Sequence, residues 1–149
     1  MDYLDIADRA WPVLGPLMRG LAALYRATGG RIGRHVPGLP PMLLLDHVGR
    51  KSGRTRTVPL VYMSDGEDLV LVAAKGGHPE DPAWAHNLRA NPDTEVQLGS
   101  ERVAVKAREV DGEERGRLWP RLVGYNPLWG RYQARTKRTI PVFVLGRNS

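Results

Sequence analysis

A short basic stretch carries the residue types best suited to binding an anion. Four cationic side chains fall within seven residues of one another, next to glycines at 49 and 53: Arg50, Lys51, Arg54 and Arg56. Arginine and lysine suit phosphate groups, and a glycine backbone can turn its N–H groups toward an anion. The pattern predicts a phosphate-binding loop, although the spacing is not that of a Walker A loop. The alternative is a solvated basic hairpin tip, because charged side chains are usually exposed.

A second position for an anion follows the apolar run of residues 69–74. Lys75, Gly76 and Gly77 stand there, just before a segment with the composition of a helix. A helix N-terminus offers free N–H groups and a partial positive charge, and both favour an anion. Asp81 can cap this helix and would repel an anion there, so we expect a ligand along residues 75–77 instead. The alternative is an ordinary strand-to-helix loop.

The sequence shows no legible constellation of catalytic or metal-binding side chains. The four histidines, at 35, 47, 78 and 86, lack the i, i+4 spacing of a helical zinc site, and the chain has no cysteine. The carboxylates form no evident acid/base pair. The sequence therefore predicts no metal and is typical of a protein whose chemistry belongs to a bound cofactor. Aromatic residues at 84 and at 119–132 could line a flat ring system, but tryptophans also fill cores.

The composition narrows the class of partner. The chain has 149 residues and a formal charge of +6, from 22 basic and 16 acidic side chains. This excess favours a phosphorylated cofactor, a nucleic acid or a lipid surface. Nucleic acid is not expected, because the chain lacks spaced stacking aromatics and a legible recognition helix. Three aspartates near the N-terminus oppose a signal peptide, and no apolar run has membrane-spanning length, so we expect a cytoplasmic protein.

Residues 3–27 predict an amphipathic N-terminal helix. Apolar side chains recur there at helical spacing, including Leu14, Leu17, Leu21 and Tyr25. Pro12 is expected to kink this helix or to start a new one, and glycines at 29 and 30 to end it. Two roles stay open: covering one face of the core, or lying on a membrane or folding over a ligand. A peripheral membrane contact through this helix is therefore one expectation.

The rest of the chain predicts strands with helices inserted between them. A hairpin is expected over residues 42–63, with further strands at 69–74, 94–98, 102–110 and 139–145. Helices are expected at 82–91, 111–123 and 126–135, and Pro141 places the last strand at a sheet edge or a bulge. About six mainly antiparallel strands predict an α+β fold and a small barrel. We expect one domain over 1–149, with the N-terminal helix and loop in 1–41 and the barrel in 42–149.

Several motifs occur in an order that resembles a known family. They are residues 49–56 (GRKSGRTR), Pro59-Leu60, residues 73–77 (AAKGG), residues 82–92 (PAWAHNLRANP) and residues 138–142 (RTIPV). This set, over roughly residues 42–147, resembles the deazaflavin (F420)-dependent nitroreductase family of mycobacteria and related actinobacteria. The resemblance implies a split β-barrel similar to FMN-binding proteins. It also implies coenzyme F420, a deazaflavin with a phosphate and an oligoglutamate tail.

The resemblance also implies which residues hold the cofactor. Arg50, Lys51, Arg56 and Lys75 would hold the phosphate and the acidic tail, while Trp84, Asn87 and the strand end at 72–74 would surround the deazaflavin. The complete set of cofactor-binding residues expected in this way is Arg50, Lys51, Ser52, Arg56, Pro59, Val72, Ala73, Ala74, Lys75, Gly76, Gly77, Trp84 and Asn87.

The acceptor pocket departs from that of the nitroimidazole-reducing members. Those proteins have tyrosines where this chain has Val61, Asn126 and Trp129, and a serine where it has Ala74, whereas Tyr132 remains. The family resemblance then implies hydride transfer from reduced F420 to an electron-poor acceptor such as a quinone or an activated C=C compound. Tyr132 is the expected hydrogen-bond donor in catalysis. The alternative is a carrier or sequestering protein that binds F420 without turnover.

Overall fold

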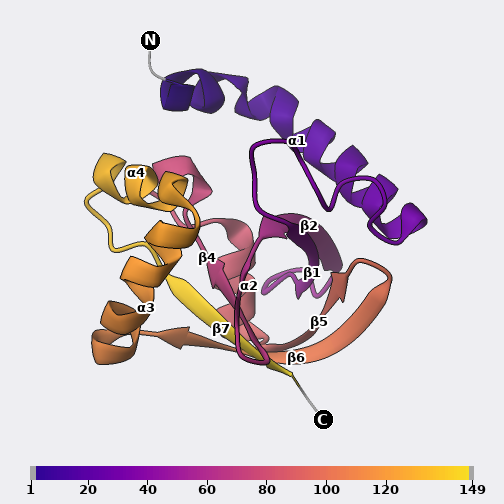
Figure 1. Ribbon diagram of the computed structural model, residues 1–149. Helices are drawn as coiled ribbons and strands as arrows, with labels where there is room; N and C mark the ends of the chain where they lie inside the picture. The colour runs from indigo at the N-terminus through magenta and orange to yellow at the C-terminus, as the bar shows by residue number, and fades with distance from the viewer. Residues whose placement is uncertain (1–2, 148–149) are drawn as a thin grey trace.

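A computed structural model describes residues 3–147, which form one curled sheet with helices around it (Figure 1). In chain order the elements are α1 (Tyr3–Thr28), β1 (Met42–Val48), β2 (Thr55–Val61), β3 (Met63–Asp65), β4 (Asp68–Val72), the 3-10 turn η1 (Lys75–Gly77), α2 (Ala83–Ala90), β5 (Asp93–Leu98), β6 (Glu101–Val110), α3 (Gly112–Tyr125), α4 (Pro127–Arg135) and β7 (Val142–Arg147).

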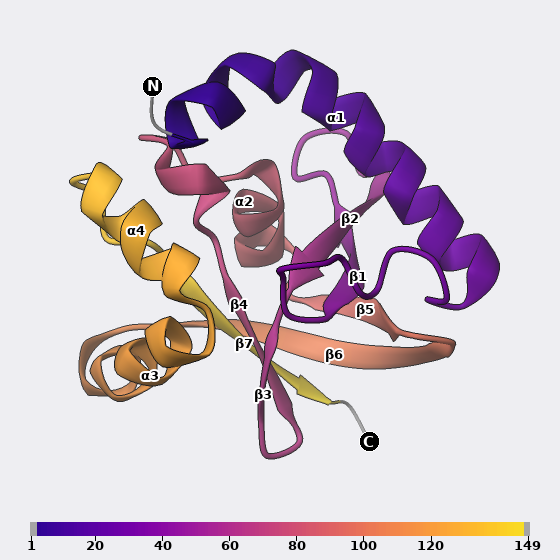
Figure 2. The same cartoon turned by 45° about the horizontal axis from the view of Figure 1, so that its top comes forward.

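The sheet has seven strands in the order β2-β1-β5-β6-β7-β4-β3, and all neighbouring pairs are antiparallel. The strands β2 and β3 follow one another in the chain yet form opposite edges of the sheet. The sheet therefore curls to bring its two edges together, as Figures 1 and 2 show. This curled sheet is the split β-barrel, so the predicted α+β fold and the predicted antiparallel pairing are confirmed.

Two features of the sheet differ from the predictions. Tyr62 separates β2 from β3, so there are seven strands where about six were expected. The Tyr62 side chain is buried and its hydroxyl accepts a hydrogen bond from Arg34 (3.1 Å), which anchors this corner of the chain. The edge position predicted for the last strand is wrong, because β7 lies between β6 and β4. Pro141 precedes the first residue of β7 and therefore removes no N–H group from the ladder.

Alternate side chains of the central strands belong to two separate hydrophobic clusters. In β4, Leu69 and Leu71 belong to the first cluster, which fills the inside of the curl and includes residues of α2. Val70 and Val72 belong to the second cluster, on the outer face, where α3 and α4 cover the sheet. The alternation follows from the two-residue period of a strand, which points neighbouring side chains to opposite faces. Both faces of this part of the sheet are therefore buried.

The C-terminal part of α1 is docked on β1 by a buried tyrosine. Tyr25 is fully buried beside Leu44, and its hydroxyl donates to the Met42 carbonyl (3.0 Å) and accepts from the Gly99 N–H (2.9 Å). The predicted helix is confirmed as a single element that continues through Pro12, and Gly29 follows it with φ +62°. This part of the helix covers the core.

An aspartate on β1 joins four elements of the fold. The Asp46 carboxylate accepts hydrogen bonds from Arg26 of α1 (2.8 Å), Thr57 of β2 (2.7 Å) and Arg102 of β6 (2.8 Å). Burial alone would raise the pKa of Asp46, but the bonds from Thr57 and Arg26 outweigh it, and this pKa lies below its ordinary value. Asp46 is therefore charged and fully partnered where α1 meets the sheet.

The helix α1 also crosses one side of the molecule. Figure 2 shows it arching from the neighbourhood of η1 at its N-terminal end to β2 at its C-terminal end, and it contacts both. Among residues 3–147, no helix combines the length and the apolar character that crossing a membrane requires.

Asp46→Ala should lower the free energy of unfolding by about 2 kcal/mol, because it removes hydrogen bonds between a carboxylate and three donors. A larger loss is not expected, since Arg26 and Arg102 are 39% and 41% exposed and water can replace part of their contacts. Asp65→Ala is the control, because it breaks a more exposed ion pair with Arg121 (3.1 Å). Urea unfolding should show a loss below about 1 kcal/mol for the control; equal losses would contradict the role of Asp46.

Candidate functional site

The basic stretch forms a closed turn at the tip of the β1–β2 hairpin. The Gly49 N–H donates to the Arg54 carbonyl, and the Gly53 N–H donates to the Gly49 carbonyl, both at 2.8 Å. Gly53 has φ +71°, a conformation that favours glycine. The Ser52 hydroxyl accepts a hydrogen bond from the Arg54 N–H (3.2 Å). The side chains of the tip are therefore carried by a turn that is held by its own hydrogen bonds.

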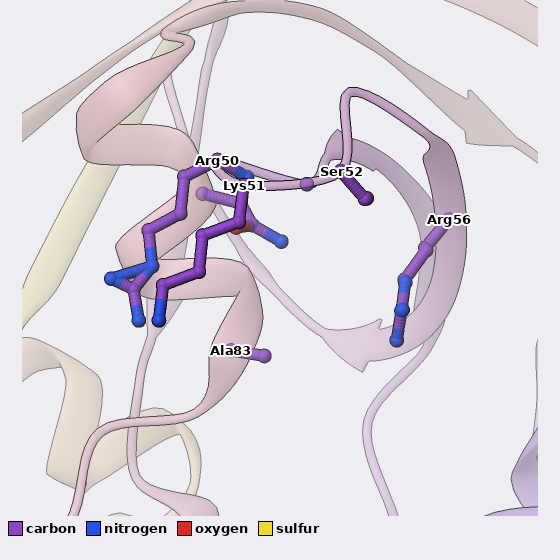
Figure 3. Close-up of a pocket in the computed structure, with 7 residues that line it drawn as sticks. Arg50, Lys51, Ser52, Arg56 and Ala83 are labelled. Atoms are coloured by element: carbon purple, nitrogen blue, oxygen red, sulfur yellow. The ribbon is translucent and has the colours of Figure 1, made fainter.

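These side chains line a cleft of about 210 Å³ between the hairpin tip and the start of α2. We call it the basic cleft, and its lining residues are Gly49, Arg50, Lys51, Ser52, Arg56, Ala83 and Asn87. In Figure 3, the Arg50 and Lys51 side chains extend in the same direction from the hairpin tip, and Arg56 extends from β2. Among these seven residues of the described chain there are three cations and no carboxylate. The cleft therefore favours an anion, and the N-terminal end of α2 at Ala83 adds to this preference.

Asn87 of α2 connects the basic cleft to the core. Its side-chain oxygen accepts the Arg50 N–H (3.0 Å), and its side-chain nitrogen faces Nδ1 of His47 (2.8 Å). Because a backbone N–H can only donate, this contact fixes the orientation of the amide, and Nδ1 of His47 must be the acceptor. His47 is therefore neutral, with its proton on Nε2.

The surroundings of His47 favour this neutral state. Burial is the main reason that the pKa of His47 falls from 6.5 to about 4; nearby Arg56 acts in the same direction and Asp46 against it. His47 and Asn87 are only 5% and 6% exposed. The loop carrying Arg50 is thus held in place by a buried amide that a neutral histidine orients.

The prediction that Asp81 caps the N-terminus of α2 is wrong. The helix begins after Pro82, and the Asp81 side chain makes no capping hydrogen bond. Asp81 instead binds Arg138 (2.8 Å) and Arg89 (3.0 Å), because two charge-assisted contacts are stronger than one bond to a backbone N–H. These two cations offset the charge of Asp81, so it does not oppose an anion at the start of α2 as the sequence suggested.

The predicted loop at residues 75–77 forms η1, at the end of β4. Lys75 has φ +45°, the only positive value outside glycine in the part of the chain that the structure describes. Such strained backbone is characteristic of functional sites. The turn contacts both α1 and α4, whereas neither Lys75 nor Gly77 lines the basic cleft. It forms a separate element of the candidate site.

The other predicted cofactor residues lie in the packed interior beside the cleft. Val72, Ala73 and Ala74 are at most 7% exposed, and Pro59 is buried on β2. Trp84 is 6% exposed, and its ring packs at a tilt against Phe143 with 5.7 Å between ring centroids. The structure thus brings Arg50, Lys51, Ser52, Arg56 and Asn87 together, and places the remaining predicted residues in neighbouring elements.

The predicted acceptor residues lie on the side of the second cluster. Val61 and Tyr132 pack against this cluster, and it contains Ala74 and the 4%-exposed Trp129. Asn126 has a structural task as well, because its side-chain oxygen accepts the Leu128 N–H (3.3 Å) at the start of α4. We call the apolar residues of this set the apolar wall; they share the second cluster, and α4, which carries Trp129 and Tyr132, contacts η1.

Two residues of the site, His47 and Ala83, are not among the residues predicted from the sequence. His47 lies 40 positions before its partner Asn87, and only the packing of α2 against β1 brings the two together. Ala83 lines the cleft through its position at the start of α2, not through its side-chain chemistry. Spacing rules for metal ligands, which exclude a histidine site, cannot detect a histidine that orients an amide.

The sequence and the fold were compared with known protein families and solved structures. Residues 17–147 match the family model described as F420H(2)-dependent quinone reductase. The chain is 46% identical over 135 residues to an F420H(2)-dependent quinone reductase of Mycobacterium tuberculosis, covering 88% of this chain and 90% of that one. It resembles the solved structure of an F420-H2 dependent reductase, FDR-A, at 40% identity and TM-score 0.65, covering 74% and 99%. It also resembles a solved domain-swapped dimer at 37% identity and TM-score 0.67, covering 93% and 98%.

The curled sheet and the basic cleft define a split-barrel protein suited to an anionic ligand. Within this class, the chain belongs to the F420H(2)-dependent quinone reductase family. The resemblance to F420-dependent reductases of mycobacteria that the sequence motifs indicated is confirmed.

The neutral state of His47 predicts a pH-dependent stability. The pKa is about 4 in the fold and 6.5 ordinarily, so the unfolded chain binds more protons between these values. The contribution of His47 to the free energy of unfolding is therefore complete above pH 6.5 and falls as the pH drops toward 4, by roughly 3 kcal/mol. Urea unfolding over this range compares the parent with His47→Gln, whose side-chain oxygen can accept from Asn87 without titrating. Equal pH slopes in the two proteins would contradict the assignment.

Proposed function

We propose that this chain is an F420H2-dependent quinone reductase whose basic cleft holds the anionic part of coenzyme F420. The observation that carries the proposal is the convergence of Arg50, Lys51 and Arg56 in a cleft without a carboxylate, in a chain of this family. The phosphate and the oligoglutamate tail of F420 are the negative groups that such a cleft can bind. The names of the family and of its relatives favour a reductase over a carrier.

The hairpin tip is preorganised for this ligand before binding. Its turn is closed by hydrogen bonds, and Asn87 holds the N–H of Arg50. A loop that is already ordered loses less conformational entropy on binding than a flexible loop does. We assign Ser52 to the same ligand, because its hydroxyl lines the cleft and can donate to an anionic oxygen.

The deazaflavin part is assigned to the elements next to the cleft. The strand end at 72–74, η1 and Pro59 on β2 would border it, with Lys75 adding a positive charge. Trp84 would support this part from the core, because its ring already packs against Phe143. This arrangement keeps the anionic groups at the basic cleft and the apolar ring system at the end of β4.

Reduced F420 supplies a hydride to an electron-poor acceptor. The chain must orient the acceptor and donate a hydrogen bond to the oxygen on which negative charge develops. We assign this donor role to Tyr132 of α4, which lies partly buried against the second cluster. Val61, Ala74 and Trp129 belong to the same apolar wall and would exclude water from the acceptor.

This function is tested by adding menadione to the protein and F420H2 and measuring the absorbance of the oxidised cofactor over time. We expect turnover that requires both the protein and F420H2. Tyr132→Phe should lower kcat by about tenfold or more, since general acid groups contribute on the order of 100-fold and upward, and it should leave F420 binding unchanged. Binding of F420 without turnover would favour the carrier function and contradict the reductase.

The outer face of α1 is the candidate for a further partner. Leu17 and Leu24 are 62% and 49% exposed and lie seven residues apart, about two helical turns, so they share one face of the helix. We propose that this apolar face contacts a membrane surface that contains anionic lipid, which the net charge of +6 attracts. A relative that assembles as a domain-swapped dimer makes a second copy of the chain the competing occupant.

Lys51→Ala and Arg56→Ala should each weaken F420 binding by about 1.5–3 kcal/mol, the range for hydrogen bonds to charged groups. Binding should also weaken as salt rises, because exposed charges are screened. Titrations at low and high salt measure both effects. Arg54→Ala is the matched control, since it removes the same charge from the same hairpin tip but Arg54 does not line the cleft. Equal losses in all three variants would mean that only net charge matters.

Quinone turnover should exceed nitroimidazole turnover at matched F420H2. A nitro compound must be oriented by hydrogen-bond donors, and a 1 Å error in placement can cost on the order of 100-fold in rate. Val61 and Ala74 offer no hydroxyl to this wall, and the Asn126 side chain is shorter than a tyrosine and is held at the start of α4 by the Leu128 N–H that its oxygen accepts. Initial rates with the two acceptors decide the question. Equal turnover would show that these positions do not set the choice of acceptor.

The membrane contact is tested by flotation with vesicles that contain anionic lipid. The parent should float, and Leu17→Glu combined with Leu24→Glu should not, because two charges then replace the apolar contacts. Ala134→Glu is the control, since it adds a charge at an exposed position on α4. If the parent stays with the soluble fraction and its size in solution is that of a dimer which the leucine variants dissociate, a second chain covers this face instead.

A further inference from the structure

The chain leaves the sheet at η1 with carbonyl groups that no strand partners. The Ala73 N–H still donates to the Pro141 carbonyl (2.9 Å), which continues the pairing of β4 with β7 by one bond. Beyond this point the carbonyls of Ala73, Ala74 and His78 all accept hydrogen bonds from one side chain, that of Arg138. Two of these carbonyls precede η1 and one follows it, so Arg138 brackets the turn.

Arg138 uses all three nitrogens of its guanidinium group. Nε donates to His78 (2.8 Å), Nη2 to Ala74 (2.8 Å), and Nη1 to both Ala73 (3.3 Å) and the carboxylate of Asp81 (2.8 Å). The guanidinium is planar and its donors have fixed directions, so it imposes a fixed arrangement on these acceptors. A lysine has the same charge but only one nitrogen, and cannot reach all four.

The segment that carries Arg138 is itself held by the end of α4. The Gln133 amide donates to the Arg138 carbonyl (2.7 Å) and accepts the Ile140 N–H (2.9 Å). The Thr136 hydroxyl accepts the Arg138 N–H (3.3 Å). The guanidinium is therefore anchored to the helix that carries Trp129 and Tyr132.

The end of η1 at Gly77 lies directly against that same helix. A Cβ atom at Gly77 would lie 2.7 Å from the Tyr132 carbonyl oxygen, so only glycine allows this approach. Lys75 is held at φ +45°, a conformation that a non-glycine residue does not keep without support. The turn is thus held both by the hydrogen bonds of Arg138 and by its close contact with α4.

We propose that Arg138 is a positioning residue that fixes η1 against α4, and through this sets the spacing between bound F420 and the quinone. Arg138 acts through the backbone of residues 73–78, because its donors are engaged there and with Asp81. The consequence for catalysis rests on the proposed function, whereas the effect on η1 does not. The competing explanation is that Arg138 serves only as a counter-ion of Asp81.

Hydrogen exchange of the protein without cofactor tests the effect on the turn. The Gly77 and His78 N–H groups donate to the Ala74 and Lys75 carbonyls (2.9 and 3.1 Å), so their exchange reports whether η1 is closed. In Arg138→Gln these two amides should exchange at least about tenfold faster, while the amides of β4 and β7 keep their protection. Arg138→Lys, which keeps the charge beside Asp81, should give an intermediate rate and serves as the test if the glutamine variant does not fold.

Arg89→Gln is the matched control, because Arg89 is the other partner of Asp81 but contacts none of the η1 carbonyls. It should leave the exchange of Gly77 and His78 unchanged. With F420H2 and menadione, Arg138→Gln should lower kcat/KM by about 100-fold, the cost of misplacement near 1 Å. Arg138→Lys should recover part of this loss, and Arg89→Gln should stay close to the parent.

Equal effects of the Arg138 and Arg89 variants on exchange and on kinetics would overturn the proposal in favour of the counter-ion. Unchanged exchange at Gly77 and His78 in both Arg138 variants would overturn it as well. A parent protein without turnover would contradict the proposed function alone, because the exchange experiment needs no cofactor and still decides the role of Arg138.

Discussion

The hydrogen bond from the Arg50 N–H to the Asn87 side chain is the constraint on which the basic cleft depends. It joins the hairpin tip to α2, two elements that adjoin only in the folded chain. The amide can make this bond because His47 is neutral and accepts from its other end. A protonated His47 would be a donor at both nitrogens and would oppose the Asn87 amide. The geometry of a cationic cleft is thus secured by an uncharged, buried pair.

Consecutive residues of β1 hold helices on opposite faces of the sheet. Asp46 binds Arg26 of α1, and His47 binds Asn87 of α2; the two-residue period of a strand separates the two contacts. Arg138 has the corresponding task at the other end of the site, where it joins η1 to the segment after α4. Apolar packing fills both clusters, but these polar contacts define how the surrounding elements are placed, because a buried polar group must find its partners.

The sequence predicted the fold and the basic loop well, since both depend on local patterns. Short apolar and β-branched runs between turn residues indicated most strands, and the charges between Gly49 and Arg56 indicated the basic loop that lines the cleft. It failed where a partner lies far along the chain: Asp81 suits a helix cap locally, but two distant arginine contacts give it stronger bonds. Pro141 suggested an edge strand because the strand was predicted to begin at residue 139, whereas β7 begins at Val142 and leaves Pro141 outside the strand. His47 and Arg138 could not be assigned, since their acceptors and donors adjoin only after folding.

The central claim is that the basic cleft selects a cofactor by its acidic groups. Equilibrium titration of the protein with F420 and with FMN, followed by tryptophan fluorescence at low salt, tests it most directly. F420 should bind more tightly than FMN, because its oligoglutamate tail adds carboxylates that Arg50, Lys51 and Arg56 can contact beyond the phosphate that both ligands carry. The difference should shrink as salt rises. Equal or tighter binding of FMN would contradict the account.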